Sequence, residues 1–146
     1  MTTLRPATPL DAGRVGAIMS AWIDETPWVP AVHTRAEDIA FAGIMIDRNW
    51  LTVAENDSVV GYLAREEEEV HALYIDPDAR GQGIGTNLVT YAMHNSDILR
   101  LWTFVANTGA QKFYERLGFV ETHRTDGASN DEHLPDIHYE WKRRTP

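Results

Sequence analysis

A glycine-rich segment between a β-rich run and an amphipathic run has a spacing that suits the binding of an anion. Arg80–Gly85 reads RGQGIG; it follows Val70–Ile75 and precedes the apolar positions Leu88 and Val89. Because glycine has no Cβ, backbone N–H groups can converge on a ligand at such a segment. The helix that follows would add unpaired N–H donors and a partial positive charge at its N-terminus. Together these features favour a site for a diphosphate group.

Two common phosphate-binding patterns do not fit this segment. A P-loop requires a Lys directly after its last glycine, whereas Thr86 follows Gly85 here. A dinucleotide-binding fingerprint requires G-x-G-x-x-G and an acidic residue at the end of the next strand. The glycines here run G-x-G-x-G, and the next β-rich run contains Trp102-Thr103-Phe104. The pattern that does match is R/Q-x-x-G-x-G/A.

With this pattern the chain resembles the GCN5-related N-acetyltransferases. A second segment, NTGAQKFYERLGF from Asn107 to Phe119, is independently similar to a later helix of that family. The resemblance implies an acetyl-CoA-dependent N-acetyltransferase, in which an amine of a small molecule or a protein attacks the thioester directly. Two alternatives stay open: an acyltransferase with another acyl group or a hydroxyl acceptor, and a non-catalytic sensor of coenzyme A.

The resemblance also implies which residues bind the cosubstrate, acetyl-CoA. Backbone groups of one strand would pair with the pantetheine arm, the glycine-rich loop would hold the diphosphate, and two residues of the later helix would lie beside the arm and the sulfur. Carried over by position, these are Leu73, Tyr74 and Ile75, then Arg80, Gly81, Gln82, Gly83, Ile84, Gly85 and Thr86, and finally Asn107 and Tyr114. No metal ion is expected.

Three residues are candidates for proton transfer. The resemblance makes Glu69 the first choice as general base, because its spacing from Gly83 matches that of the catalytic glutamate in histone-type members. His71 is the rival base: it lies two residues further on, so strand alternation puts it on the same face, and an unperturbed histidine suits proton transfer. Tyr114 is the candidate general acid. The alternative for Glu69 is that Glu66–Glu69 is a solvated acidic turn without a catalytic role. The alternative for Tyr114 is that it is a packed core tyrosine.

The acceptor site is expected in the loop between the first two helices and in the last strands. The first contains the stiff segment TPWVP, and the second contains the polar run DGASNDEHLPD. An aromatic face with carboxylates suits a cationic amine. The candidate residues are Trp28, His33, Asn130, Glu132 and Asp136.

Composition restricts the class of protein further. The formal net charge is −9, from 22 acidic residues against 13 Lys and Arg, and such a field disfavours nucleic acid as a partner. There is no Cys, which excludes disulfides, thiolate metal sites and Cys nucleophiles. No apolar signal core and no membrane-spanning window are found, so we expect a cytoplasmic protein without a membrane partner. A homodimer is allowed, because dimers are common among similar proteins.

The elements that must position these residues can be read from periodicity and turn signals. Residues 1–146 are expected to form a single domain of α+β class in the order βααβββαβαββ, with about four helices and a mixed, mostly antiparallel sheet of the type found in acyl-CoA N-acyltransferases. Thr34 and Glu37 form a capping box for the second helix, for which Ile39, Ala40, Ile44 and Met45 are the expected apolar positions. Asn56-Asp57-Ser58 predicts a hairpin turn.

Overall fold

A computed structural model describes residues 2–144 of the chain. The order of helices and strands is the predicted one, with two short 3-10 turns added at Pro9–Asp11 and Pro77–Ala79. The helices are α1 Ala12–Glu25, α2 Arg35–Asp47, α3 Ile84–His94 and α4 Thr108–Arg116. The strands are β1 Thr3–Pro6, β2 Leu51–Asn56, β3 Ser58–Glu66, β4 Glu69–Ile75, β5 Ile98–Phe104, β6 Val120–Thr125 and β7 Asp136–Lys142.

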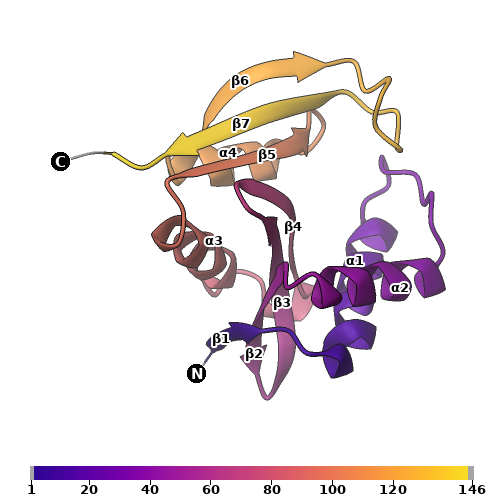
Figure 1. Cartoon of the computed structure of the whole chain (residues 1–146). Coiled ribbons are helices and arrows are strands. Elements are labelled where there is room, and N and C mark those ends of the chain that lie inside the picture. Colours follow the sequence, from indigo (N-terminus) through magenta and orange to yellow (C-terminus); the bar gives the residue numbers. More distant parts are fainter. Residues whose placement is uncertain (1, 145–146) are drawn as a thin grey trace.

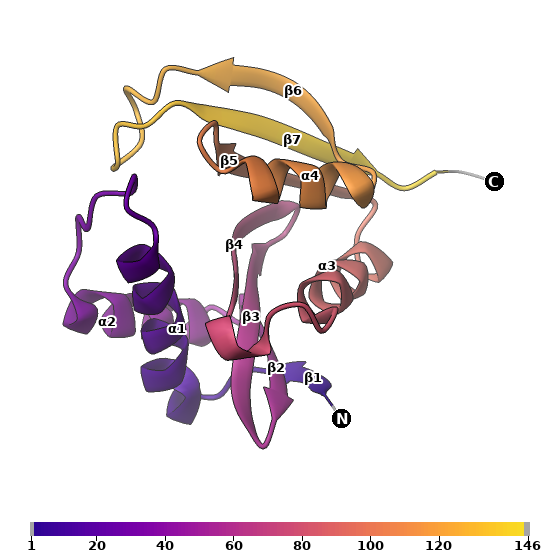
Figure 2. The same cartoon turned by 180° about the vertical axis from the view of Figure 1, so that it is seen from behind.

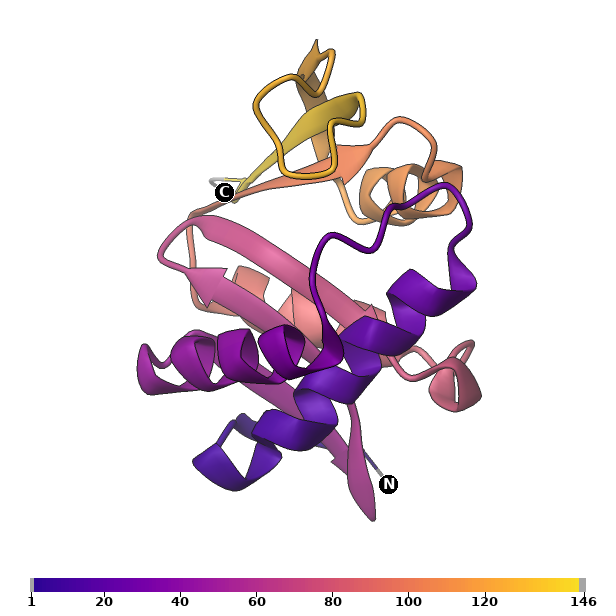
Figure 3. The ribbon, with the colours of Figure 1, turned by 90° about the vertical axis from the view of Figure 1, so that its right-hand side faces the viewer.

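The seven strands form one sheet in the order β1-β2-β3-β4-β5-β7-β6. Every neighbouring pair is antiparallel except β4 and β5, which confirms a mixed, mostly antiparallel sheet. Helices α1 and α2 lie against one face of β2–β4, and α3 lies on the opposite face (Figures 1 and 3). One apolar core therefore joins α1 and α2 to the sheet, and a second core joins α3 and α4 to it.

The parallel pair, β4 and β5, touches only at one end. Glu69 is the single β4 residue in register with β5, opposite Arg100. The Arg100 N–H donates to the carbonyl of Glu68 at 2.8 Å, and beyond this point the two strands diverge (Figure 2). The β5 side of Val70–Ile75 is therefore free of strand pairing, and an opening runs between the two halves of the sheet.

A β-bulge in β4 sets which side chains face which core. Ala64 pairs with Ala72 but Arg65 pairs with Val70, so His71 is the extra residue on β4. A bulge of this kind interrupts the alternation of side chains. As a result Leu73 packs with the α3–α4 core, while Ala72 and Tyr74 pack with the α1–α2 core.

Helix α2 buries a different face from the one its sequence predicts. Met45 is buried as expected, but Ile39 and Ile44 are 41 % and 45 % exposed. The buried positions are Asp38, Ala42, Met45 and Ile46, which lie at i, i+4, i+7 and i+8. The first of these buried residues is an aspartate. A prediction that counts only apolar residues therefore assigns the wrong face of α2 to the core. Across residues 2–144, none of the helices has the length and apolar character needed to span a bilayer.

Candidate active site

The glycine-rich segment lines a cavity of about 470 Å³ at the N-terminus of α3, called here the α3 cavity. Gly81 and Gly83 have φ angles of 78° and 79°, in the left-handed region that favours glycine, and Gly83 is the N-cap of α3. A Cβ built on either residue would meet no atom within 4 Å. The first N–H groups of α3 have no acceptor within the helix. Open space, free donors and the helix dipole at one place fit a diphosphate.

The residues predicted to bind coenzyme A are only partly gathered at the α3 cavity. Its walls come from the start of α3, the end of β4 and one face of α4, and are formed by Ile75, Ala79, Arg80, Gly81, Gly83, Ile84, Gly85, Thr86, Phe113, Arg116 and Leu117. Gln82 is exposed and does not line it. Leu73, Tyr74, Asn107 and Tyr114 do not line it either. The Oδ1 of Asn107 instead caps α4 by accepting from the Ala110 N–H at 3.1 Å.

Two arginines border the α3 cavity. Arg80, predicted from the motif, forms an ion pair with Glu25 at the end of α1 and donates from Nε to the carbonyl of Ile75 at 3.3 Å. Arg116 was not singled out from the sequence. It lies one turn after Phe113 on the same face of α4, so the signal available was its i+3 spacing from that aromatic residue. A cation at this place suits a phosphate-bearing ligand.

A larger cavity of about 980 Å³, called here the α1–α2 cavity, lies on the other side of the opening. It is bordered by α1, α2 and their connecting loop, by β4 and β5, and by the β6–β7 loop. Its aromatic walls are Trp22, Phe41, Tyr74, Trp102 and Phe104. Its carboxylates are Glu37, Asp38, Asp131, Glu132 and Asp136, and the described residues that line it include no Lys or Arg. The cavity therefore offers an apolar, aromatic surface with a negative charge.

Four of the five predicted acceptor residues line the α1–α2 cavity: His33, Asn130, Glu132 and Asp136. Trp28 does not. Its ring packs edge-on against Trp22 and Phe104, with centroids 6.1 Å and 5.7 Å away, so it supports the wall from behind.

Three of these residues also hold the loops that close the cavity. The imidazole nitrogens of His33 lie 3.7 Å from Glu37 and 3.9 Å from Asp131, which brings α2 to the β6–β7 loop. Asn130 donates from Nδ2 to the carbonyl of Leu134 at 2.8 Å and to Asp136 at 3.2 Å. Glu132 has no such partner among the described residues, so its carboxylate is free to meet a ligand.

The two candidate bases occupy different positions. Glu69, at the start of β4, lines neither cavity. His71 lines the α1–α2 cavity. Its ring stacks on Trp50 with centroids 4.9 Å apart, and its Nε2 lies 2.9 Å from Glu66. Glu66 is also the register partner of Glu69, so the same residue contacts His71 and lies opposite Glu69.

Tyr74 lines the α1–α2 cavity, whereas the candidate acid Tyr114 lies in the α3–α4 core and lines neither cavity. Tyr114 is 8 % exposed and packs against Phe113 and Phe119, with centroids 5.1 Å and 5.4 Å away. Burial raises the pKa of its hydroxyl well above the usual value, and the nearby Tyr74 raises it further. Burial of the Tyr74 hydroxyl raises its pKa to about 12, with Glu132 and then Asp38 adding to the effect. Both phenols therefore keep their protons at neutral pH.

The amino-acid sequence of the chain matches one family model and several known proteins. The model of the acetyltransferase (GNAT) domain matches residues 46–121, just over half of the chain. The peptidyl-lysine N-acetyltransferase YjaB of Salmonella typhimurium is 40 % identical over 77 residues, which are 53 % of each chain. The alignments cover 53 % of that protein and 33 % of a second curated relative. The chain therefore spans at most about half the length of these two relatives.

Solved structures agree with the fold. The solution structure of apo YjaB from Escherichia coli has a TM-score of 0.80 at 26 % identity, over 96 % of this chain and 97 % of that one. The structure of YncA from Salmonella typhimurium with acetyl-CoA has a TM-score of 0.75 at 16 % identity, over 100 % of this chain and 98 % of that one. The domain match lies on the same β4–loop–α3 unit that builds the α3 cavity, and the chain belongs to the GNAT acetyltransferase family.

Proposed function

We propose that this chain transfers the acetyl group of acetyl-CoA to an amine. The observation that carries the proposal is the opening of β4 away from β5 directly beside the glycine-capped N-terminus of α3. A diphosphate held at Gly81–Thr86 would direct the rest of the cosubstrate along β4, towards the second, acidic cavity. The relative named as a peptidyl-lysine N-acetyltransferase and the fold neighbour with acetyl-CoA support this assignment.

The binding roles follow from groups that the fold leaves unpaired. The Asp76 N–H donates to the carbonyl of Val60 on β3, so by alternation the backbone groups of Tyr74 also point to β3 and those of Leu73 and Ile75 point to the opening. The carbonyl of Ile75 accepts from Arg80, which leaves Leu73 and the Ile75 N–H to pair with the pantetheine arm as a neighbouring strand would. The N–H groups of Gly83, Ile84 and Gly85 would receive the diphosphate, with Gln82 and Asn107 further out. A backbone N–H near Leu73 would also stabilise negative charge on the thioester oxygen, and donors of this kind contribute about 3 kcal/mol.

The chemistry needs no covalent enzyme intermediate, because the thioester is already reactive. An amine held in line forms the new C–N bond as the C–S bond breaks. Because only a neutral amine can attack, a base first removes a proton from the bound ammonium: Glu69 directly or through water, or His71 from the cavity wall. Tyr114 retains its proton at neutral pH, so it can supply that proton to the departing thiolate. The acidic, aromatic walls of the α1–α2 cavity favour a cationic acceptor on a small molecule or a protein.

A release assay tests this proposal. Purified protein is mixed with acetyl-CoA and a panel of amines, and free thiol is measured. We expect turnover with at least one amine, and a loss of at least about tenfold in the Tyr114→Phe and Glu69→Gln variants with coenzyme A affinity retained. Turnover on hydroxyl compounds alone would favour the O-acyltransferase alternative. Tight binding of coenzyme A with no turnover would favour the sensor. A single domain, a cytoplasmic location and a homodimer stay predictions of the sequence.

A further inference from the structure

Asp38 is a buried carboxylate without a cationic partner. It is 4 % exposed, and its Oδ2 accepts a hydrogen bond at 2.8 Å from the hydroxyl of Ser20, which is equally buried. Among the ion pairs of residues 2–144, none involves Asp38. Burying a carboxylate is unfavourable unless it is matched by a cation or by several donors. One hydroxyl provides little of that compensation.

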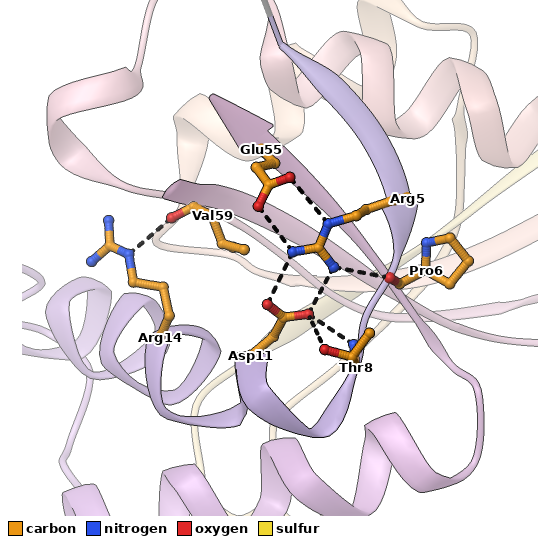
Figure 4. A network of polar contacts seen from close by, with 7 residues as sticks. All are labelled: Arg5, Pro6, Thr8, Asp11, Arg14, Glu55 and Val59. Atoms are coloured by element: carbon orange, nitrogen blue, oxygen red, sulfur yellow. Dashed lines mark hydrogen bonds and ion pairs between the residues drawn. The ribbon is translucent and has the colours of Figure 1, made fainter. Parts of the chain in front are cut away.

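Within residues 2–144, the other buried carboxylate, Asp11, shows how the fold treats such a group when its role is structural. Asp11 is 8 % exposed. Arg5 donates to its two oxygens at 2.9 Å and 3.1 Å, and the Thr8 N–H donates at 2.8 Å (Figure 4). The same guanidinium also binds Glu55. Asp11 is thus fully paired, whereas Asp38 is not.

Asp38 lines the α1–α2 cavity, whose described lining residues include no Lys or Arg. An unpartnered polar group lies on β5 in the lining of the same cavity: Thr103 is 8 % exposed, and its Oγ1 has no hydrogen-bond partner in the described chain. One cavity is therefore bordered by a buried carboxylate with a single hydroxyl donor and by a buried hydroxyl with no partner, although buried polar groups are normally fully hydrogen-bonded. Each is explained if a ligand completes the site.

The position of Asp38 separates it from the reacting centre. Asp38 lies in the first turn of α2 and Glu132 lies in the β6–β7 loop, and both line the α1–α2 cavity, whereas Tyr114 on α4 lines neither cavity. The cavity therefore has one anionic position in the loop and another on the helix, and its lining also includes the aromatic side chains of Trp22, Phe41 and Tyr74. A substrate with a single amine would use only one of these positions.

We propose that Asp38 binds a second, non-reacting cationic nitrogen of the acceptor, and that the acceptor is a dication such as an α,ω-diamine. This inference rests on the proposed acetyl transfer. The reacting amine lies near the opening, the alkyl chain lies along Trp22, Phe41 and Tyr74, and the distal ammonium pairs with the carboxylate of Asp38. Ser20 is then a positioning residue that holds the carboxylate through its hydroxyl.

Calorimetry with the protein saturated in coenzyme A tests this inference. Cadaverine and putrescine are compared with pentylamine and butylamine, which have the same chain lengths and one ammonium each. A charge-assisted hydrogen bond at a buried site corresponds to about tenfold in affinity, so we expect wild-type protein to bind at least one diamine that much more tightly than its monoamine. Equal affinities within both pairs would overturn the inference, whatever any variant does.

Asp38→Asn keeps the size of the side chain and its bond to Ser20. We expect this variant to bind the diamine no more than about twofold more tightly than the monoamine, while monoamine affinity stays unchanged. Asp47→Asn makes the same change at an exposed position of α2 outside the cavity, and should keep the wild-type preference. A retained preference in folded Asp38→Asn would also overturn the inference.

The same experiment separates failure of this inference from failure of the proposed function. If the protein binds coenzyme A but shows no preference for diamines, the dication site is contradicted and the proposed acetyl transfer is not. No heat with coenzyme A contradicts the proposed function itself. A diamine preference in calorimetry, with no thiol released from acetyl-CoA in the release assay, supports the cation site at Asp38 and contradicts the transferase.

Discussion

The Gly83→Ala substitution should change both the stability of the protein and its affinity for coenzyme A, and the two effects can be measured separately. Gly83 has a φ of 79° and caps α3. A residue with a Cβ is disfavoured by about 1–2 kcal/mol in this conformation. A new Cβ would meet no atom within 4 Å, so no steric clash adds to this penalty. For a domain of this size we expect the melting temperature to fall by about 3–6 °C.

The effect on coenzyme A should be larger than the effect on stability. The space above Gly83 is where the diphosphate must approach the N–H groups at the start of α3, and a methyl group would occupy it. We expect the Kd for coenzyme A to rise by at least about tenfold, or 1.4 kcal/mol. Isothermal calorimetry gives the affinity, and differential scanning calorimetry of the same sample gives the stability.

Gly13→Ala is the matched control. Gly13 lies in α1 with open space around its Cβ position, and alanine there should stabilise the helix by about 0.5–1 kcal/mol. Its affinity for coenzyme A should equal that of the wild type. If Gly83→Ala lost stability as expected but bound coenzyme A as tightly as Gly13→Ala, the assignment of the loop to the diphosphate would be wrong.

Three further changes test other parts of the molecule. Tyr114→Phe should lower kcat at least about tenfold with little change in KM for acetyl-CoA, and an unchanged kcat would remove Tyr114 as the acid. Asp11→Asn should destabilise the fold by about 2 kcal/mol at pH 7, less than for a fully buried pair because Arg5 is partly exposed. Since Arg5 lowers the pKa of Asp11 from 3.8, this stabilisation is present above that pH and lost as the pH falls through the lower, folded-state pKa. Urea unfolding at pH 7 and pH 3 should therefore show the wild-type advantage shrinking, and an equal advantage at both would refute the pairing. Gly127→Ala should destabilise the β6–β7 loop by at least about 2 kcal/mol, because φ is 85° and the Cβ would lie 2.2 Å from the carbonyl oxygen of Leu134; an unchanged urea midpoint would contradict this loop conformation.

The order of elements could be predicted because local signals mark almost every boundary. Thr34 and Glu37 do form the capping box of α2, and Asp57 takes the left-handed φ of 63° that the hairpin turn requires. Gly83 and Gly118 lie where a helix begins and where one has just ended, both with positive φ. Each of these signals depends on only a few neighbouring residues, so the sequence displays it directly.

Features that depend on contacts between distant residues were not predicted. The bulge at His71 follows from the register between β3 and β4, and the packing of Trp28 follows from where Trp22 and Phe104 lie in space. Asp38 reads as an ordinary polar residue in the first turn of a helix. Its burial becomes visible only when α2 is packed against α1 and Ser20.

The same limit applies to the candidate site. The RGQGIG motif predicted the start of α3 and five of the residues around its cavity. Arg116 joins them only because α4 packs beside α3, which brings Phe113 to 3.4 Å from the Cβ position of Gly85. Spacing along the chain carries no information about that contact.

Amide chemical shifts during a titration with coenzyme A test most directly whether the loop before α3 holds the diphosphate. In a ¹⁵N-labelled sample we expect the largest changes at the N–H groups of Gly81, Gly83 and Gly85 and along Leu73–Ile75, with Thr3–Pro6 at the far edge of the sheet unchanged. Absence of change at these glycines in the presence of millimolar coenzyme A, or changes confined to other parts of the sheet, would contradict the proposed binding site and the acetyl transfer that depends on it.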